Sequence, residues 1–410
     1  MSKIIEPKYK FIDLFAGCGG LSEGFYRMGF KALAHVEIDH AACETLRTRM
    51  RYYHYDNADE AVIEHDITAD DIIDRIDNVI KGEKPDVIIG GPPCQAYSTA
   101  GRVRDKEGMA HDSRNYLFES YQRILEKYKP KFFVFENVTG LLSAKVNNEY
   151  IFPKVINALG KDYKVIDDPS ILVHNTCNYG VPQIRKRVII MGVRKDLINK
   201  EVIDLYREVV KTHFDPEMSE NDRLGLKPYV TVEQALGDLP SVEPGCDAST
   251  SEYEYSCNNE FLQRIGKKGI HPLMDHVCRK HNPTDRERFR EMISHHWAFG
   301  QLRREKPEYE HENPRVFDNS YVVQWWDLPS KTILAHIHKD GFQFIHPDLK
   351  QARTFTVREA ARIQSFPDDF VFEGSRGNKF KQIGNAVPPL FAEALAKSIK
   401  LNLDDLNNDL

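Results

Sequence analysis

The first 200 residues alternate between short apolar runs and amphipathic stretches, and this alternation restricts the fold more than any other feature. The apolar runs predict strands over residues 10–17, 31–39, 85–91, 131–138 and 187–193. Nearly continuous apolar strands separated by helices are typical of a parallel sheet that is covered on both faces. Ligands of such sheets bind at the carboxyl ends of the strands, so the residues after each strand are the first candidates for a site.

The chain has 410 residues, which is too long for one compact core and predicts two domains. After about residue 200 the alternation is lost, and the chain becomes irregular, with scattered Pro, Gly, His and aromatic residues. We predict an α/β domain over residues 1–200, completed by a C-terminal helix over about 376–410. A second, smaller and irregular domain is predicted over residues 215–375.

Composition excludes several other classes of protein. The amino-terminal residues lack the apolar segment of a signal peptide, and no apolar stretch is long enough to span a membrane, so we expect a cytoplasmic protein. Seven cysteines without a CxxC pair predict neither a disulfide framework nor a zinc site, and we expect no metal. The net charge of −6 argues against a generally basic surface but leaves room for a local basic patch.

A glycine-rich turn follows the first predicted strand. Gly17, Gly19 and Gly20 let the backbone approach a ligand closely, and the helix that follows offers free N–H groups to an anion. Glu37, after the second strand, suits the two hydroxyls of a ribose. A nicotinamide-dinucleotide enzyme would show much the same layout. Asp66, near the end of a third strand, is suited to accept from an adenine amino group or to cap the next helix.

Residues 90–98, GGPPCQAYS, present a cysteine on a rigid turn after an apolar strand. A thiolate is the best nucleophile among side chains at neutral pH, so Cys94 is a candidate for attack on a bound substrate. A buried structural cysteine is the alternative, but two prolines beside the thiol are poorly suited to filling a core.

Charged residues flank the next two strands. Glu136 ends the strand over 131–138, where we expect its carboxyl group to be largely removed from water. Gln183, Arg185 and Arg187 alternate, so in an extended segment their side chains would share one face. A solvated charged edge is the alternative interpretation of this segment.

Taken together, these segments resemble the DNA (cytosine-5)-methyltransferase family, of the bacterial restriction–modification type. The order DLFAGCGG, GGPPCQAYS, ENV, QIRKR, REAARIQSFPDDF and QIGNAVPP is that of the family and extends from residue 10 to about 400. The one visible departure is Tyr97, where the motif usually has Phe. The resemblance implies a Rossmann-like mixed sheet flanked by helices, as in S-adenosylmethionine-dependent methyltransferases, with a smaller irregular target-recognition domain.

The resemblance also implies roles for individual residues. The family's cofactor is S-adenosyl-L-methionine, expected near Phe15, Gly17, Gly19, Gly20, Glu37, Asp66, Ile67, Pro92 and Asn385. Of these, Pro92 supplies a backbone acceptor near the cytosine amine.

The same resemblance implies a catalytic set. Cys94 attacks carbon 6 of cytosine, Glu136 bonds ring N3 and the exocyclic amine, and Arg187 binds the carbonyl oxygen with Arg185 in support. Three residues are expected to touch DNA: Gln95, Ser98 and Thr332. The loop after Ser98, to about residue 115, suits a lid that closes over the flipped base, with a passive loop as the alternative.

Residues 262–306 hold eleven Lys and Arg against five Asp and Glu, a balance of +6. We expect this segment to follow the phosphates of double-stranded DNA. The partners implied are duplex DNA and a separately acting restriction endonuclease, and we expect a monomer. The alternatives are an RNA (tRNA) cytosine-5 methyltransferase of the same fold, a non-catalytic DNA-binding relative and a dinucleotide oxidoreductase.

Overall fold

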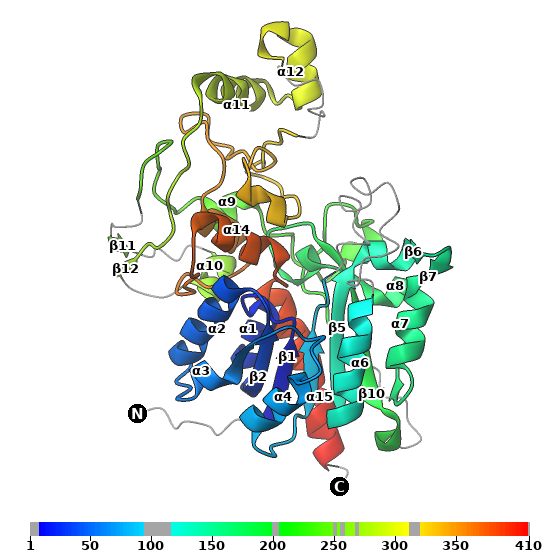
Figure 1. Ribbon diagram of the computed structural model, residues 1–410. Coiled ribbons are helices and arrows are strands. Elements are labelled where there is room, and N and C mark those ends of the chain that lie inside the picture. Colours follow the sequence, from blue (N-terminus) through cyan, green and yellow to red (C-terminus); the bar gives the residue numbers. More distant parts are fainter. Residues whose placement is uncertain are drawn as a thin grey trace. The chain divides into compact units, whose positions relative to one another are not determined.

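The computed structural model describes residues 8–93, 116–198, 205–248, 252–254, 259–266, 270–310 and 320–408 (Figure 1). Cys94, Gln95, Ser98 and the loop to residue 115 lie outside the described residues, as does Tyr97. The chain divides into two compact units. Unit 1 comprises Met1–Tyr179, Lys186–Lys211 and Val387–Leu410, and unit 2 comprises Gly180–Arg185 and Thr212–Ala386.

Unit 1 is built on a sheet of eight strands in the order β3-β2-β1-β4-β5-β10-β8, with β9 also paired to β10. The strands are β1 (Tyr9–Leu14), β2 (Phe30–Glu37), β3 (Val62–Glu64), β4 (Val87–Gly90), β5 (Phe132–Val138), β8 (Tyr163–Lys164), β9 (Val173–Asn175) and β10 (Lys186–Arg194). The first five run parallel, whereas β10 is antiparallel to β5. The sheet is therefore mixed, as the family resemblance implied, and not wholly parallel as the strand–helix alternation alone indicated.

Helices flank this sheet (Figure 1). The helices of unit 1 are α1 (Gly20–Arg27), α2 (His40–Tyr52), α3 (Ala58–Ala61), α4 (Ile72–Ile80), α6 (Leu117–Tyr128), α7 (Ile151–Leu159), α8 (Pro169–Leu172) and α15 (Pro389–Asn408). A short hairpin of β6 (Lys145–Val146) and β7 (Glu149–Tyr150) precedes α7.

The strands bury both of their faces because their side chains alternate between two helix layers. Ile12 and Leu14 of β1 belong to one apolar cluster with residues of α4, α6 and α7. Phe11 points to the other face, where its ring lies 5.4 Å from that of Phe25 in α1. This two-sided burial explains why the strands are apolar along their whole length.

Unit 2 has little regular structure and is held by polar contacts as well as apolar ones. Its helices are α9 (Val232–Leu236), α10 (Glu260–Ile265), α11 (Pro283–His295), α12 (Phe299–Glu305), α13 (Val357–Ile363) and α14 (Arg376–Asn385), and β11 (Glu252–Glu254) pairs with β12 (Ile270–Pro272). Arg353 and Arg362 are buried and bind the carboxylates of Glu359 and Asp368. A second apolar cluster forms around Phe289 of α11.

The carboxyl-terminal segment differs from the single helix expected over 376–410. Two helices are present, and α14 belongs to unit 2 whereas α15 belongs to unit 1. Pro388 and Pro389 stand at the break, where a proline has no N–H to continue α14 but fits the first turn of α15. Among the described residues, no helix is both long and apolar enough to cross a membrane.

Close packing of α1 on α15 gives the first prediction. A Cβ at Gly24 would lie 2.3 Å from the carbonyl carbon of Ala392, so Gly24→Ala must push the two backbones apart. We expect the free energy of unfolding to fall by about 1–3 kcal/mol or more, measured by urea denaturation. Gly377→Ala in α14 is the control, because its Cβ would meet nothing closer than 3.7 Å. Equal stability of the two variants would contradict the packing described here.

Candidate active site

The site predicted from the sequence lies where the strand order reverses. β1 has β2 on one side and β4 on the other, so the segments after β1 and β4 leave the same edge of the sheet at neighbouring positions. The first of these is the glycine turn and the second is Gly91–Pro93, which leads directly to Cys94. Such a reversal is where open α/β sheets bind their ligands.

The glycine turn uses backbone conformations that side chains rarely adopt. Gly17 and Gly19 have φ of 54° and 86°, and Phe15 has φ of 56° although it is not glycine. At Gly19 a Cβ would also lie 2.8 Å from the side chain of Leu46. Gly20 begins α1, which directs that helix's amino-terminal N–H groups toward the turn. The turn is therefore a strained, closely packed bend of the kind that approaches a ligand with its backbone.

Glu37 fastens this turn to the end of β2. One carboxylate oxygen accepts the N–H of Gly17 at 2.7 Å, and the other accepts those of Ile38 and Asp39 at 2.8 and 2.9 Å. Burial raises the pKa of Glu37, while the three N–H donors act in the opposite direction. Each carboxylate oxygen can accept more than one hydrogen bond, so this anchoring leaves capacity for the hydroxyls of a sugar.

The structure gives Asp66 and Ile67 internal roles. The Asp66 carboxylate accepts the N–H and the hydroxyl of Thr68, both at 2.8 Å, which lowers its pKa. These bonds form a local turn and do not cap the next helix, because α4 begins at Ile72 with Asp71 at its N-cap, and the Asp66 side chain remains exposed. The Ile67 side chain is buried in the apolar cluster of α4, α6 and α7. Any contact of Ile67 with a ligand would therefore use its backbone.

The segment before Cys94 packs against the end of β5. A Cβ at Gly91 would lie 2.7 Å from a carboxylate oxygen of Glu136, so any side chain at position 91 would require that carboxylate to shift. The carbonyl of Pro92 accepts a hydrogen bond from the buried side-chain amide of Asn137 at 3.3 Å. The side chains of Glu136 and Asn137 thus contact the backbone of Gly91 and Pro92, which shortly precede the cysteine.

Glu136 forms an ion pair across the sheet. Its Oε1 lies 2.9 Å from Nε of Arg187, and both side chains are nearly buried, with 12% and 10% exposed. The antiparallel pairing of β10 with β5 brings Arg187 opposite Val138, two positions from Glu136 on the facing strand. A carboxylate and a guanidinium therefore stand together beside the turn that leads to Cys94.

Gln183 and Arg185 belong to unit 2, whereas Arg187 belongs to unit 1. All three are buried, so the alternative of a solvated charged edge is wrong. The Arg185 guanidinium donates to the carbonyls of Ile333, Gly384 and Ala386. Arg185 therefore holds unit 2 together.

Thr332 and Asn385 also lie in unit 2. The Thr332 hydroxyl donates to the carbonyl of Ile184 at 2.7 Å, and the N–H of Ile333 donates to Gln183 at 2.6 Å. The Thr332 side chain is thus engaged within the protein. Asn385 is exposed at the end of α14.

A buried polar network beneath the glycine turn was missed by the sequence analysis. Ser22 of α1 donates to Asp13 at 2.5 Å and lies 3.4 Å from Nδ1 of His35, whose Nε2 lies 2.8 Å from the Tyr26 hydroxyl. Burial raises the pKa of Asp13 to about 8 and lowers that of His35 to about 3. Both groups are therefore uncharged near neutral pH. The signal available in the sequence was a carboxylate inside an otherwise apolar strand.

One cluster of potential metal ligands occurs among the described residues. The donor atoms of His40, Glu44 and Glu64 lie within 4.8 Å of one another. The guanidinium of Arg47 contacts both carboxylates, at 2.5 Å for Glu44 and 3.3 Å for Glu64. The positive charge at this exposed cluster is thus already supplied by an arginine.

The fold is a mixed α/β sheet flanked by helices, and comparison with known proteins identifies the class as methyltransferase and the family. Residues 9–401 match the family described as C-5 cytosine-specific DNA methylase, and the chain belongs to it. Among its relatives, type II methyltransferase M.Bpa9945I of Bacillus paralicheniformis is 35% identical over 95% of this chain and 98% of its own length. Type II methyltransferase M.DdeI of Desulfomicrobium norvegicum is 33% identical over 97% of this chain and 89% of its own length.

Solved structures agree on the fold. A protein named for DNA modification methyltransferase activity, encoded within an E. coli prophage, superposes with a TM-score of 0.68 at 27% identity, covering 97% of this chain and 100% of that one. The S. pombe Dnmt2 methyltransferase has a TM-score of 0.53 at 14% identity, covering 98% and 100%, and shows the fold alone. The protein is thus a DNA (cytosine-5) methyltransferase with type II relatives, and not a dinucleotide oxidoreductase.

The buried Asp13 gives a prediction on pH. The folded protein keeps the Asp13 proton up to about pH 8, whereas the unfolded chain releases it near the ordinary value of 3.8. The unfolded state therefore binds fewer protons in this window, and the free energy of unfolding falls as the pH rises through it. Asp13→Asn removes this contribution, so the variant should gain stability relative to wild type between pH 5 and pH 8 in urea titrations.

Asp66→Asn is the matched control for Asp13→Asn. The pKa of Asp66 is lowered, so its contribution is present throughout pH 5–8 and is lost only in acid. The difference between this variant and wild type should stay constant over the window. Parallel curves for wild type and Asp13→Asn would show that the Asp13 carboxyl is not held protonated.

Proposed function

We propose that the enzyme transfers a methyl group from S-adenosyl-L-methionine to carbon 5 of a cytosine within a specific duplex DNA sequence, with Cys94 as the nucleophile. The observation that carries the proposal is the packing of Gly91 and Pro92 against Glu136 and Asn137, in a chain that belongs to the cytosine-5 family. Residue 94 follows this backbone segment in the sequence, which supports its assignment beside the Glu136 carboxylate.

The cofactor is proposed to lie at the glycine turn. The Glu37 carboxylate suits the ribose of the cofactor, and the strained turn from Phe15 to Gly19 lets the backbone approach the cofactor closely. These two features fit S-adenosyl-L-methionine. Asp66 remains exposed for the adenine, with the backbone of Ile67 beside it. Bound there, S-adenosyl-L-methionine supplies an electrophilic methyl group. Asn385 is also proposed to contact the cofactor.

The chemistry required explains the side chains. Carbon 5 of cytosine is a weak nucleophile until a thiolate adds to carbon 6. In our proposal the Cys94 sulfur forms that bond, while Glu136 contacts N3 and the exocyclic amine, the Pro92 carbonyl accepts from that amine, and Arg187 contacts the carbonyl oxygen. Once carbon 5 has accepted the methyl group, with the demethylated thioether as the leaving group, the carbon 5 proton would pass to water. The bond between carbon 6 and the Cys94 sulfur then breaks, the thiolate leaves and aromaticity returns. Covalent catalysis of this kind divides one difficult step into easier ones.

Duplex DNA imposes a further requirement, because carbon 6 is inaccessible in a stacked base pair. The target nucleotide must be rotated out at a cost of a few kcal/mol, which contacts with DNA must offset. We propose that DNA is contacted by Gln95, Ser98 and Thr332, and that the loop from Ser98 to residue 115 acts as a lid.

Because the relatives are type II methyltransferases, we propose that a separately acting restriction endonuclease is the cognate partner. We also propose that the enzyme is a monomer and that it acts on DNA in the cytoplasm.

Substitution of the nucleophile tests this proposal. Cys94→Ser should lower the rate of methyl transfer by at least about a thousandfold, because a serine hydroxyl is not ionised at neutral pH, while binding of S-adenosyl-L-methionine is unchanged. Sequencing of 5-methylcytosine in DNA treated with wild type identifies the product and the target site. Cys246→Ser is the control, because Cys246 is an exposed cysteine in unit 2. Comparable activity of the two variants would refute the assignment of Cys94.

Asn137 gives a prediction on positioning. Asn137→Ala removes the hydrogen bond to Pro92, so the segment that carries Cys94 loses an anchor. We expect kcat to fall about 10–100-fold with unchanged cofactor affinity, because small misplacements of reacting groups are costly. Asn157→Ala, at an exposed position of α7, should behave as wild type. A normal kcat for Asn137→Ala would mean that this hydrogen bond does not position the nucleophile.

A further inference from the structure

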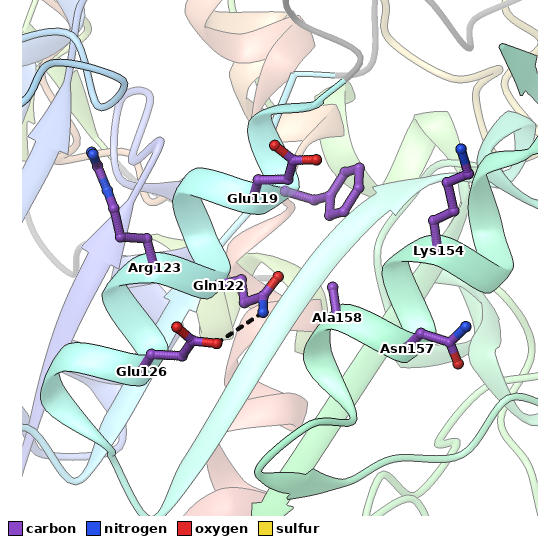
Figure 2. A pocket seen from close by; sticks show the side chains of 8 residues that line it. Glu119, Gln122, Arg123, Glu126, Lys154, Asn157 and Ala158 are labelled. Atoms are coloured by element: carbon purple, nitrogen blue, oxygen red, sulfur yellow. Dashed lines mark hydrogen bonds between the residues drawn. The ribbon is translucent and has the colours of Figure 1, made fainter. Parts of the chain in front are cut away.

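Two hollows among the described residues differ in how their charges are compensated. The hollow between α6 and α7 in unit 1 has a volume of about 570 Å³ and mixes acidic with basic side chains (Figure 2). Its Lys154 and Glu126 are already paired, with Glu149 and Lys161 respectively. Charge alone therefore gives this hollow no preference for a ligand.

The hollow in unit 2, at the start of α11, has a different character. It has a volume of about 630 Å³ and draws its lining from four separate parts of the chain. The basic lining residues are Arg279, Lys280, Lys339 and Arg376. We name this group the basic hollow.

Acidic side chains do not neutralise the basic hollow. Of its two carboxylates, Asp285 is buried and already binds the guanidinium of Arg288 at 2.9 Å and the Tyr321 hydroxyl at 2.9 Å. Asp340 accepts the N–H of Phe342 and stands against four cations. None of the four basic side chains forms an ion pair with a described residue. The hollow therefore holds an excess of positive charge.

This excess is unusual within the basic segment over residues 262–306. Most of the other basic side chains described there are paired with carboxylates: Arg286 with Glu243, Arg288 with Asp285, Arg290 with Glu287, Arg303 with Glu310 and Lys306 with Glu291. From the sequence we expected the whole segment to follow DNA phosphates. The pairing restricts this expectation to the basic side chains that have no carboxylate partner.

Arg279 is the fixed element of the basic hollow. Its guanidinium is buried and donates to the carbonyls of Lys339 and Ile337, both at 2.9 Å, while its Nε has no hydrogen-bond partner. Gly341 permits this placement, since a Cβ there would lie 3.3 Å from Cζ of Arg279. Burial and then the neighbouring charge of Arg376 lower the pKa of Arg279 to about 10, so the group stays charged at neutral pH. An anion would relieve this unfavourable cluster.

We propose that the basic hollow binds a phosphodiester group of the duplex DNA backbone, with Arg279 as its fixed cation and Lys280, Lys339 and Arg376 around the phosphate. This inference rests on the proposed function and adds a site of contact to it. The three outer cations are exposed and so can reach a large polyanion. Lysine is a point charge that suits phosphate oxygens, and such contacts position a protein without reading sequence.

The test uses the full-length enzyme and the triple variant Lys280→Gln, Lys339→Gln, Arg376→Gln. Arg279 is left in place because its hydrogen bonds support unit 2. Binding of target and non-target duplexes is measured over a series of salt concentrations. We expect affinity to fall about tenfold for both duplexes, and the slope of log affinity against log salt to become shallower by about 1.

The control for the triple variant is Lys227→Gln, which removes an exposed charge already paired with Glu260 and should change neither affinity nor slope. Thermal unfolding and cofactor binding check that the variants fold. An unchanged slope in the triple variant would overturn the proposal, as would weaker binding of the target duplex alone. If the triple variant lost binding of inorganic phosphate but bound DNA normally, this result would also overturn the proposal for the basic hollow. Failure of wild type to methylate DNA would instead refute the proposed function.

Discussion

The carboxylate of Glu136 is the group on which the proposed active site depends. It lies between the guanidinium of Arg187 on the facing strand and the backbone of Gly91 on the neighbouring one. This arrangement needs an antiparallel β10, a residue without a side chain at position 91, and an amide at position 137 that holds the Pro92 carbonyl. A change at any of these positions would displace the carboxylate relative to the segment that presents Cys94.

The cofactor half of the site depends on the core beneath it. The glycine turn has positive φ at Phe15, Gly17 and Gly19 and is held by Glu37 at the end of β2, and α1 begins directly after it. Asp13 and Ser22 join the strand before the turn to the helix after it by a buried hydrogen bond. Because this network is uncharged near neutral pH, it can sit between strand and helix without an unpaired buried charge.

Much of this architecture could be predicted from the sequence. The apolar runs located β1, β2, β4, β5 and β10, since strands buried on both faces leave a signal along their whole length. The direction of β10 could not be predicted from periodicity alone, because a strand has the same pattern in either direction. The break before α15 was missed because helical spacing continues on both sides of Pro388. Motif order identified the family, and Cys94 remains a prediction from that order.

Side-chain environments were the least predictable features. Alternation placed Gln183, Arg185 and Arg187 on one face, but the structure divides them between two units and buries each with its own partners. The net charge of residues 262–306 likewise said nothing about which cations are paired, because pairing depends on contacts such as Arg303 with Glu310.

The most direct test of the account is covalent trapping. Wild-type enzyme, S-adenosyl-L-methionine and duplex DNA with 5-fluorocytosine at every cytosine of one strand would be combined, and the protein–DNA adduct digested for mass spectrometry. We predict a stable adduct whose nucleotide is attached to the sulfur of Cys94, because fluorine at carbon 5 cannot leave as a proton does. Two duplexes would be used, each with the other strand substituted. If an active enzyme formed no adduct with either duplex, or if the adduct were attached to a different residue, the mechanism would be contradicted.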